Sequence, residues 1–434
     1  MNNYLQQARQ TEQFLAANQV TTDAGIAWQR IPGGKPVHNL YHGTAGVLLF
    51  YIELYLESDD PAYLAIACGA GDEILAYLQN KPAKHFVGSG FYSGWPGYVY
   101  ALHELYKVSQ DNRYEEGAKA ALTQLTDQSS VIGRGIGWVE PIPFADITGI
   151  SGEREVVDLS VGAAGAGVIY LYAFREGLLP DLTLAIQTAE RLLEVAEATP
   201  DGLRWLMMVD MPFAFTAPNF AHGGAGVGYF LADLYRDTGN QAYLDAAISA
   251  AEYVKSRAVP QTEGMLVCHL EEQQPPTTFY LGVCHGPAGT GRLMYLLQQI
   301  TGDASYLQWL DDNFLGLLST GAPEVRSKGL WQNLGQCCGD AGIGDYALYL
   351  YKVTGNSAYL DYATRTALML ASAGDESHGL CWHNAEHRSR PEFTETQTGY
   401  MQGAAGIGSF LLHLGSVVDN KPVKLVLPET PFGY

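Results

Sequence analysis

Two kinds of apolar pattern alternate along this chain and predict pairs of helices. Segments such as 227–239 (VGYFLADLYRDTG) and 343–355 (IGDYALYLYKVTG) are the more apolar kind, which is typical of a buried helix. Segments such as 242–256 (AYLDAAISAAEYVKS) and 358–372 (AYLDYATRTALMLAS) carry apolar residues at helical spacing on one face. The pattern therefore predicts a buried inner helix followed by a half-exposed outer helix, repeated along the chain.

A Gly-x-x-Gly element precedes the more apolar helix of each pair and occurs seven times. Successive first glycines lie 51 to 68 residues apart, about the length of a helical hairpin with its loops. The elements are Gly43–Gly46, Gly94–Gly97, Gly162–Gly165, Gly223–Gly226, Gly286–Gly289, Gly339–Gly342 and Gly403–Gly406. We expect an all-α fold in which residues 1–434 form one domain and seven hairpins close into an α/α toroid. An open superhelix of stacked hairpins is the alternative.

The outer helices share a start signal that confirms the period of the repeat. Asn240 and Asn356 are favourable N-cap residues, and Asp60-Pro61 places proline at a first helical position. Twenty residues after the first glycine stands an aromatic or apolar residue: Tyr63, Tyr114, Leu182, Tyr243, Tyr306 and Tyr359. The loops contain a further recurrence, Gly-x-x-Trp, for which we expect short β-hairpins on the rim; it ends at Trp28, Trp138, Trp205 and Trp382.

Charge and cysteine usage limit the partners and the compartment. The formal net charge of −21 argues against nucleic acid and anionic membranes, which bind clustered Lys and Arg. No apolar run approaches the roughly 18–20 residues of a membrane span, and the first residues lack the pattern of a secretion signal. Six cysteines, two of them adjacent, do not resemble a disulfide framework. We therefore expect a cytoplasmic protein in which clustered cysteines bind metal or react.

Reactive residue types gather at one position of the repeat, just before the first glycine. Cys284 and Cys337 stand two residues before it, and His222, His285 and Cys338 stand one residue before it. In a closed ring these positions converge on the central cavity at the N-termini of inner helices, where the helix dipole stabilises thiolates. Three thiolates suit zinc with its fourth position open, as in catalytic sites. The alternative is three buried free cysteines, which are common in cores.

Asp158 precedes the third glycine element by four residues and should also face the inner rim. The usual alternative for an isolated Asp at such a place is an N-cap. Cys68, Cys268 and Cys381 lie outside the register, and we assign them to packing.

The ordered set DLSVGAAG, NFAHGGAG, VCHGPAG and QCCGDAG resembles the lanthionine synthetase C-like (lanthipeptide cyclase) family over all seven repeats. The resemblance implies an α/α toroid with one catalytic zinc ion. It also implies the reaction, addition of a peptide cysteine thiol to dehydroalanine or dehydrobutyrine to give a thioether. The partner would be a dehydrated precursor peptide, supplied by a separate dehydratase or a kinase and lyase.

Residue by residue, the resemblance implies zinc ligands at Cys284, Cys337 and Cys338. It implies acid/base work for His222, an active-site carboxylate at Asp158, and a Tyr or His position at His285. Cys338 stands where most members have histidine, as in a subgroup with three cysteine ligands. A second departure lies before Cys284, where Tyr280 replaces the usual arginine and Val283 the usual tryptophan.

Three other functions fit parts of the sequence. Some relatives add glutathione to dehydroamino acids in proteins, which uses the same zinc chemistry with another nucleophile. A non-catalytic, zinc-stabilised peptide-binding module is a second alternative, favoured by the missing arginine. A toroidal glycosidase would use the rim tryptophans, and it requires paired carboxylates in the cavity.

Overall fold

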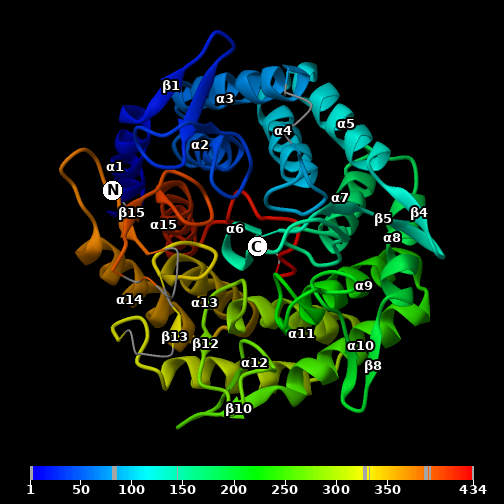
Figure 1. Ribbon diagram of the computed structural model, residues 1–434. Coiled ribbons are helices and arrows are strands. Elements are labelled where there is room, and N and C mark those ends of the chain that lie inside the picture. The colour runs from blue at the N-terminus through cyan, green and yellow to red at the C-terminus, as the bar shows by residue number, and fades with distance from the viewer. Residues whose placement is uncertain are drawn as a thin grey trace.

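The computed structural model describes residues 3–80, 86–143, 145–325, 330, 331, 333–385, 390 and 392–432, which form a two-layered ring of helices (Figure 1). The inner helices are α2 (Thr44–Ser58), α4 (Trp95–Ser109), α7 (Ala163–Arg175), α9 (Gly224–Thr238), α11 (Pro287–Thr301), α13 (Asp340–Thr354) and α15 (Ala404–Val418). The outer helices are α1 (Asn3–Ala17), α3 (Pro61–Asn80), α5 (Asn112–Asp127), α8 (Thr183–Glu194), α10 (Gln241–Ser256), α12 (Ser305–Leu318) and α14 (Ser357–Ala373). Within the part of the chain that the structure describes, no helix combines the length and apolarity of a membrane span.

Backbone hydrogen bonds close the ring at the positions two residues before the first glycines. Each of these residues donates its N–H to the carbonyl oxygen of its counterpart in the next repeat, at N–O distances of 2.8–3.4 Å. The donors run in order around the ring and return to the start: Tyr41, Tyr92, Ser160, Ala221, Cys284, Cys337 and Met401. Each inner helix also contacts the next, and α15 contacts α2. The predicted closed toroid is confirmed, and the open superhelix is excluded.

The seventh helix pair combines the two ends of the chain. Six inner helices are followed in sequence by their outer partners, as the repeat predicts. The last inner helix, α15, packs instead against the N-terminal helix α1. Figure 1 shows the two side by side, in red and blue. Ring closure therefore requires contacts between residues at opposite ends of the sequence.

The two layers differ in burial as their sequences predict. In α2 every residue from Thr44 to Leu54 is buried. In α5 burial follows one helical stripe, at Tyr114, Ala118, Ala121, Leu122 and Leu125. The expected N-caps are present on α10 and α14, where the side chains of Asn240 and Asn356 accept hydrogen bonds from backbone N–H groups.

The second glycine of each element permits close contact between a helix and the loop before it. A Cβ atom on Gly289 would lie 1.9 Å from the carbonyl oxygen of Val283. A Cβ atom on Gly342 would lie equally close, 1.9 Å, to that of Gln336. Both loops carry cysteines of the predicted site, so the glycines fix those cysteines against the first turns of α11 and α13.

Short antiparallel hairpins stand at three of the four Gly-x-x-Trp sites, whereas the fourth, Gly379–Trp382, has only isolated β-bridges. They are β1 (Gln19–Thr21) with β2 (Ile26–Gln29), β4 (Ser130–Ile132) with β5 (Gly135–Gly137), and β8 (Glu197–Thr199) with β9 (Gly202–Arg204). The remaining strands are β3 (Pro36–Val37), β6 (Val139–Pro141), β7 (Glu153–Glu155), β10 (Ala258–Pro260), β11 (Met265–Val267), β12 (Phe279–Tyr280), β13 (Leu330–Trp331), β14 (His383–Asn384) and β15 (Glu395–Thr396). A short helix, α6 (Ala145–Thr148), follows β6 and lies near the centre of the ring in Figure 1.

The four tryptophans of the recurrence anchor these rim segments to outer helices. All four are buried, and each indole N–H donates to a leucine carbonyl oxygen of α1, α5, α8 or α14 at 2.7–2.9 Å. The acceptors are Leu15, Leu125, Leu192 and Leu370. Because their ring faces are buried, these tryptophans offer no platform for a sugar.

The C-terminal segment crosses the centre of the ring, as the red trace in Figure 1 shows. Its residue Glu429 is fully buried and accepts hydrogen bonds from the Tyr92 hydroxyl and from Arg292 Nη1, both at 2.9 Å. Two more ring tyrosines, Tyr100 and Tyr229, donate to carbonyl oxygens of the same segment. The segment is therefore part of the packed interior.

Breaking the Arg292–Glu429 ion pair is expected to destabilise the fold strongly. Arg292→Met leaves the Glu429 carboxylate buried without its cation, a change that typically costs about 3–5 kcal/mol. Urea unfolding of this variant and of Arg292→Met/Glu429→Gln measures the effect. We expect the double variant to recover much of the loss. An exposed ion pair contributes at most about 1 kcal/mol. A free energy of unfolding of Arg292→Met within that amount of the parent value would contradict a buried ion pair of this strength.

Candidate metal centre and active-site cavity

Three cysteine sulfurs lie together at the inner rim, where the repeat register predicts them. Cys284 Sγ is 2.9 Å from Cys338 Sγ, and Cys338 Sγ is 3.5 Å from Cys337 Sγ. All three sulfurs lie within 4.8 Å of one another, and all three residues are buried. Bonds of about 2.3 Å to a tetrahedral ion put sulfurs roughly 3.8 Å apart. The cluster therefore fits a single metal ion with little adjustment.

The backbone explains why cysteines from two repeats meet. Cys284 N–H donates to the Cys337 carbonyl oxygen at 3.1 Å, one link of the closed circle of hydrogen bonds. Cys284 precedes the N-cap of α11, and Cys337 and Cys338 precede the N-cap of α13. The positive ends of two helix dipoles therefore lie beside the sulfurs, which favours their thiolate forms.

Interactions within the cluster shift the pKa values of Cys337 and Cys284 in opposite directions. Interactions with the thiols of Cys284 and Cys338 hold the pKa of Cys337, despite its burial, well below the ordinary value. Burial raises the pKa of Cys284 well above its ordinary value, and its interactions with Cys337 and Cys338 act in the same direction. Cys337 therefore gives up its proton more readily than Cys284.

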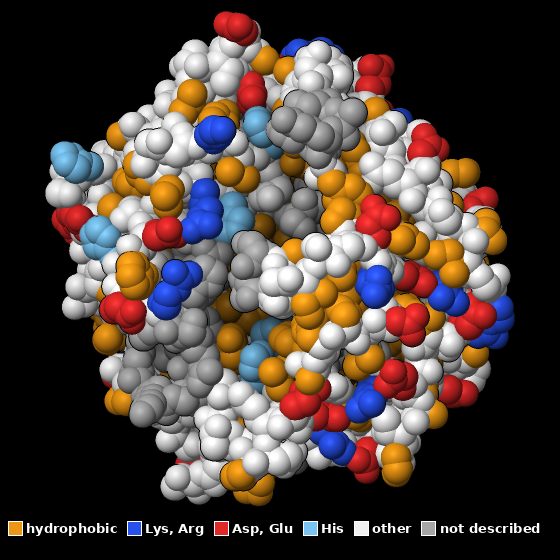
Figure 2. Space-filling view, viewed as in Figure 1, with side chains coloured by type: hydrophobic (Ala, Val, Ile, Leu, Met, Phe, Trp, Pro, Cys, Tyr) orange, Lys and Arg blue, Asp and Glu red, His pale blue; other side chains and the backbone are white. Residues whose placement is uncertain are grey.

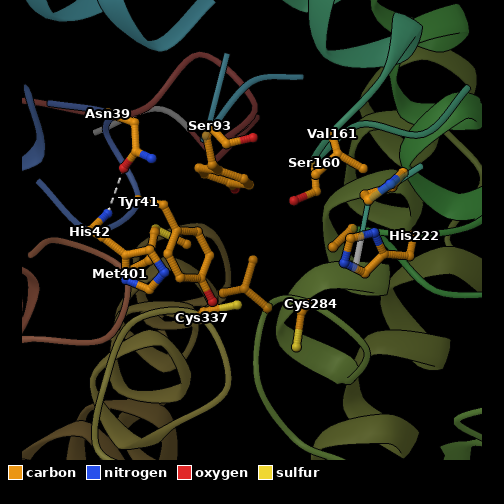
Figure 3. A pocket seen from close by; sticks show the side chains of 14 residues that line it. Asn39, Tyr41, His42, Ser93, Ser160, Val161, His222, Cys284, Cys337 and Met401 are labelled. Carbon is orange, nitrogen blue, oxygen red and sulfur yellow. Dashed lines mark hydrogen bonds between the residues drawn. The ribbon is translucent and has the colours of Figure 1, made fainter. Parts of the chain in front are cut away.

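A cavity of about 330 Å³ opens beside the sulfurs (Figure 3). Its lining consists of Asn39, Tyr41, His42, Tyr92, Ser93, Pro143, Ser160, Val161, Ala221, His222, Val283, Cys284, Cys337 and Met401. Figure 2 shows hydrophobic and histidine side chains around a hollow near the centre of this face. No carboxylate is among the described lining residues, so the cavity lacks the acid pair that a glycosidase requires.

His222, which lines the cavity, forms a hydrogen-bonded pair with the buried Asp158. His222 Nδ1 is 2.7 Å from Asp158 Oδ2, and the backbone N–H of Val161 donates to Asp158 Oδ1 at 2.8 Å. Burial opposes a charged imidazole, but the Asp158 carboxylate outweighs it and raises the pKa of His222. Asp158 is not the N-cap of α7, which is Gly162; its carboxylate instead holds the turn before that helix and contacts His222.

His285 connects the cysteine cluster to a group of aromatic rings. Its ring centroid lies 5.4 Å from that of His222, 4.6 Å from His269 and 5.2 Å from Tyr280. Burial, followed by the charges of His269 and His222, holds the pKa of His285 well below its ordinary value. His285 Nδ1 is buried and has no hydrogen-bond partner among the described residues. Tyr280, which replaces the usual arginine, packs its ring against that of His269, with 4.4 Å between the ring centroids.

The structure adds residues to which sequence reasoning gave no role. Tyr41 and Gln402 occupy the same register as the cysteines in the first and seventh repeats, so the repeat contained a signal for both. His269 lies far from any glycine element, and its place beside His285 follows only from the path of the loop after β11.

A buried carboxyl group near the cavity gives an expectation for pH dependence. Glu140 on β6 accepts a hydrogen bond from the backbone N–H of Ser89 at 2.8 Å, and burial raises its pKa from 4.5 to about 8. The neighbouring charge of Asp158 contributes in the same direction. The folded state therefore holds this proton more tightly than the unfolded chain, and stability falls as pH rises from about 4.5 to about 8.

Glu140→Gln is expected to remove this loss of folding stability at high pH. Its melting temperature minus that of the parent should be more positive at pH 9 than at pH 5, because glutamine is neutral at both. Scanning calorimetry at the two pH values measures the difference. The same difference at both pH values would show that Glu140 does not keep its proton in the folded state.

Comparison with known proteins agrees with this architecture. The chain matches the family described as lanthionine synthetase C-like protein over residues 37–424. No curated protein sequence gives a significant match. Among solved structures, nisin cyclase is similar with a TM-score of 0.60 and 14% identity, over 88% of this chain and 89% of that chain. D-mannose isomerase is similar with a TM-score of 0.51 and 13% identity, over 95% and 97%.

At such identities the structural likeness shows the fold alone, a ring of paired helices. The family match shows more than the fold, because its range contains all seven glycine elements and the three clustered cysteines. This chain belongs to the lanthionine synthetase C-like family.

Proposed function

We propose that this protein is a zinc-dependent cyclase that adds peptide cysteine thiols to dehydroalanine or dehydrobutyrine and so forms (methyl)lanthionine rings. One observation carries the proposal: three clustered cysteine sulfurs adjoin a cavity lined by His222, whose imidazole is hydrogen-bonded to Asp158. Family membership and the likeness to nisin cyclase support it. Its partner would be a dehydrated peptide made by a separate enzyme, in the reducing cytoplasm that six cysteines without a disulfide favour.

Cys284, Cys337 and Cys338 would hold one zinc ion. Three soft sulfur donors in a buried group suit zinc, and three protein ligands leave a fourth position open, as in catalytic zinc sites. A zinc ion held there would supply Lewis-acid chemistry, because it would lower the pKa of an entering thiol and so favour the nucleophilic thiolate. A purely structural site would use four protein ligands, and the group found among the described residues has three.

The other residues would bind the substrate and move the proton. The thiol sulfur bonds to the β-carbon of the dehydro residue, and the electron pair of the broken π bond passes to the amide oxygen. His285, next to Cys284, would donate a hydrogen bond to that oxygen. His222, held through Nδ1 by Asp158, would carry through Nε2 the proton lost by the thiol and deliver it to the α-carbon. No atom is lost, so the product has the mass of the substrate.

The cavity admits only part of a peptide. At about 330 Å³ it lies at the lower end of the range for small-molecule sites, roughly 300–1,000 Å³. It therefore suits the two reacting residues, while the rest of the peptide stays at the mouth.

A peptide with one cysteine and one dehydroalanine tests the proposal. Because cyclisation leaves the mass unchanged, the product is detected as peptide that N-ethylmaleimide no longer labels. We expect loss of labelling that depends on both protein and metal. A parallel reaction of glutathione with a cysteine-free dehydroalanine peptide separates the cyclase from a glutathione-adding enzyme. Peptide that binds but stays fully labelled would support a non-catalytic binding module instead.

A further inference from the structure

Tyr41 approaches the cysteine cluster from the first repeat. It belongs to the closed backbone circle, as Cys284 and Cys337 do, and it lines the cavity. Figure 3 shows its hydroxyl group directed at the Cys337 sulfur. The hydroxyl group and the sulfur form a side-chain hydrogen bond.

The direction of this hydrogen bond is set by Gln402. The Gln402 side-chain oxygen accepts from Asn333 Nδ2 at 2.6 Å and from Asn384 Nδ2 at 3.3 Å. Its Nε2 consequently points the other way and donates to Tyr41 Oη at 3.0 Å. The same nitrogen lies 3.9 Å from Cys338 Sγ, within donating distance of a sulfur atom.

The direction of each hydrogen bond in this series is fixed. A hydroxyl group has a single proton, and Tyr41 Oη already accepts from Gln402, so its proton remains for Cys337. The three amide side chains are buried, and their hydrogen bonds hold Gln402 in one orientation. The arrangement therefore directs two hydrogen-bond donors at two sulfurs of the cluster.

We propose that Tyr41 and Gln402 are positioning residues that donate hydrogen bonds to the thiolates of Cys337 and Cys338 and partly neutralise their charge. This inference rests on the proposed metal centre. Three thiolates on a divalent ion leave a net charge of −1, and an entering substrate thiolate raises it to −2. Hydrogen bonds to ligand sulfur withdraw electron density, so they tune the metal and orient the ligands. The pair thus compensates for the third thiolate at Cys338.

Cobalt(II) replacement of the metal gives a direct reading of sulfur electron density. Thiolate-to-cobalt charge-transfer absorption moves to lower energy when the sulfur becomes richer in electrons. Tyr41→Phe removes one donor and keeps the ring, so we expect this absorption to shift to lower energy. We also expect zinc affinity to fall by roughly 10–100-fold, the usual effect of losing such a partner. Circular dichroism checks that the variant is folded.

Tyr92→Phe is the matched control, because Tyr92 lines the same cavity but donates its hydroxyl proton to Glu429. We expect the cobalt absorption of this variant to stay at the position of the parent protein. Replacing Tyr41 with 3-fluorotyrosine, a stronger donor, should shift the absorption to higher energy, so the sign reverses without loss of the ring.

An unchanged absorption in Tyr41→Phe, or an equal shift in Tyr92→Phe, would overturn the role of Tyr41 and leave the metal centre standing. A parent protein that binds neither cobalt nor zinc would overturn the metal centre itself. The two failures are therefore distinguished in one series of spectra.

Discussion

Cys338→Ala is expected to abolish stable zinc binding and, with it, ring formation. The variant keeps two of three sulfur ligands in a buried site that offers no replacement among the described residues. Loss of an outer-shell partner lowers metal affinity by roughly 10–100-fold, and loss of a direct ligand should exceed that. The measurement is zinc per protein after dialysis against a weak chelator, with peptide cyclisation followed in parallel.

Two controls make this result specific. Cys338→His restores a nitrogen ligand at the position where most family members carry histidine, so we expect zinc to return. Cys381→Ala removes another buried cysteine, whose sulfur contacts the Asp375 carbonyl oxygen outside the cluster, and should leave zinc unchanged. Equal zinc content in Cys338→Ala and the parent protein would remove Cys338 from the metal centre.

His222→Ala is expected to slow cyclisation by roughly 10²–10⁴-fold, the usual contribution of a positioned acid/base residue, while zinc stays bound. The imidazole does not belong to the cysteine cluster, and its hydrogen bond goes to Asp158. Asp158→Asn keeps the size of the side chain but removes the charge that raises the pKa of His222. We therefore expect Asp158→Asn to be slow as well, with zinc retained.

His383→Ala is the control for this pair, because His383 lies exposed on β14 and contacts Thr396 and Asp375 rather than the cavity. Its cyclisation rate should equal that of the parent protein. Full activity of His222→Ala would assign the proton transfer to another group, and loss of zinc in that variant would make His222 a structural support of the metal centre.

Much of the ring could be predicted because every repeat has the same local structural requirement. Glycine is needed wherever the loop folds back onto the first turn of an inner helix, as at Gly289, and this need marks the period. Once the period is known, Cys284 and Cys337 occupy equivalent positions. The closed backbone circle then requires them to be neighbours.

Features without periodicity could not be predicted. The pairing of α1 with α15 joins opposite ends of the chain, and the burial of Glu429 depends on a segment after the last repeat. His269 reaches His285 through an irregular loop. The assignment of residues 1–434 to one domain, the roles of the site residues and the cytoplasmic location stay predictions.

The most direct test of the central claim is zinc X-ray absorption spectroscopy of the purified protein, before and after addition of a cysteine-containing dehydropeptide. We predict one zinc ion with three sulfur ligands at about 2.3 Å and one lighter ligand. The light ligand should be replaced by a fourth sulfur when the peptide is added. A protein without zinc, or a zinc ion whose ligands stay unchanged when the peptide thiol is present, would contradict the account.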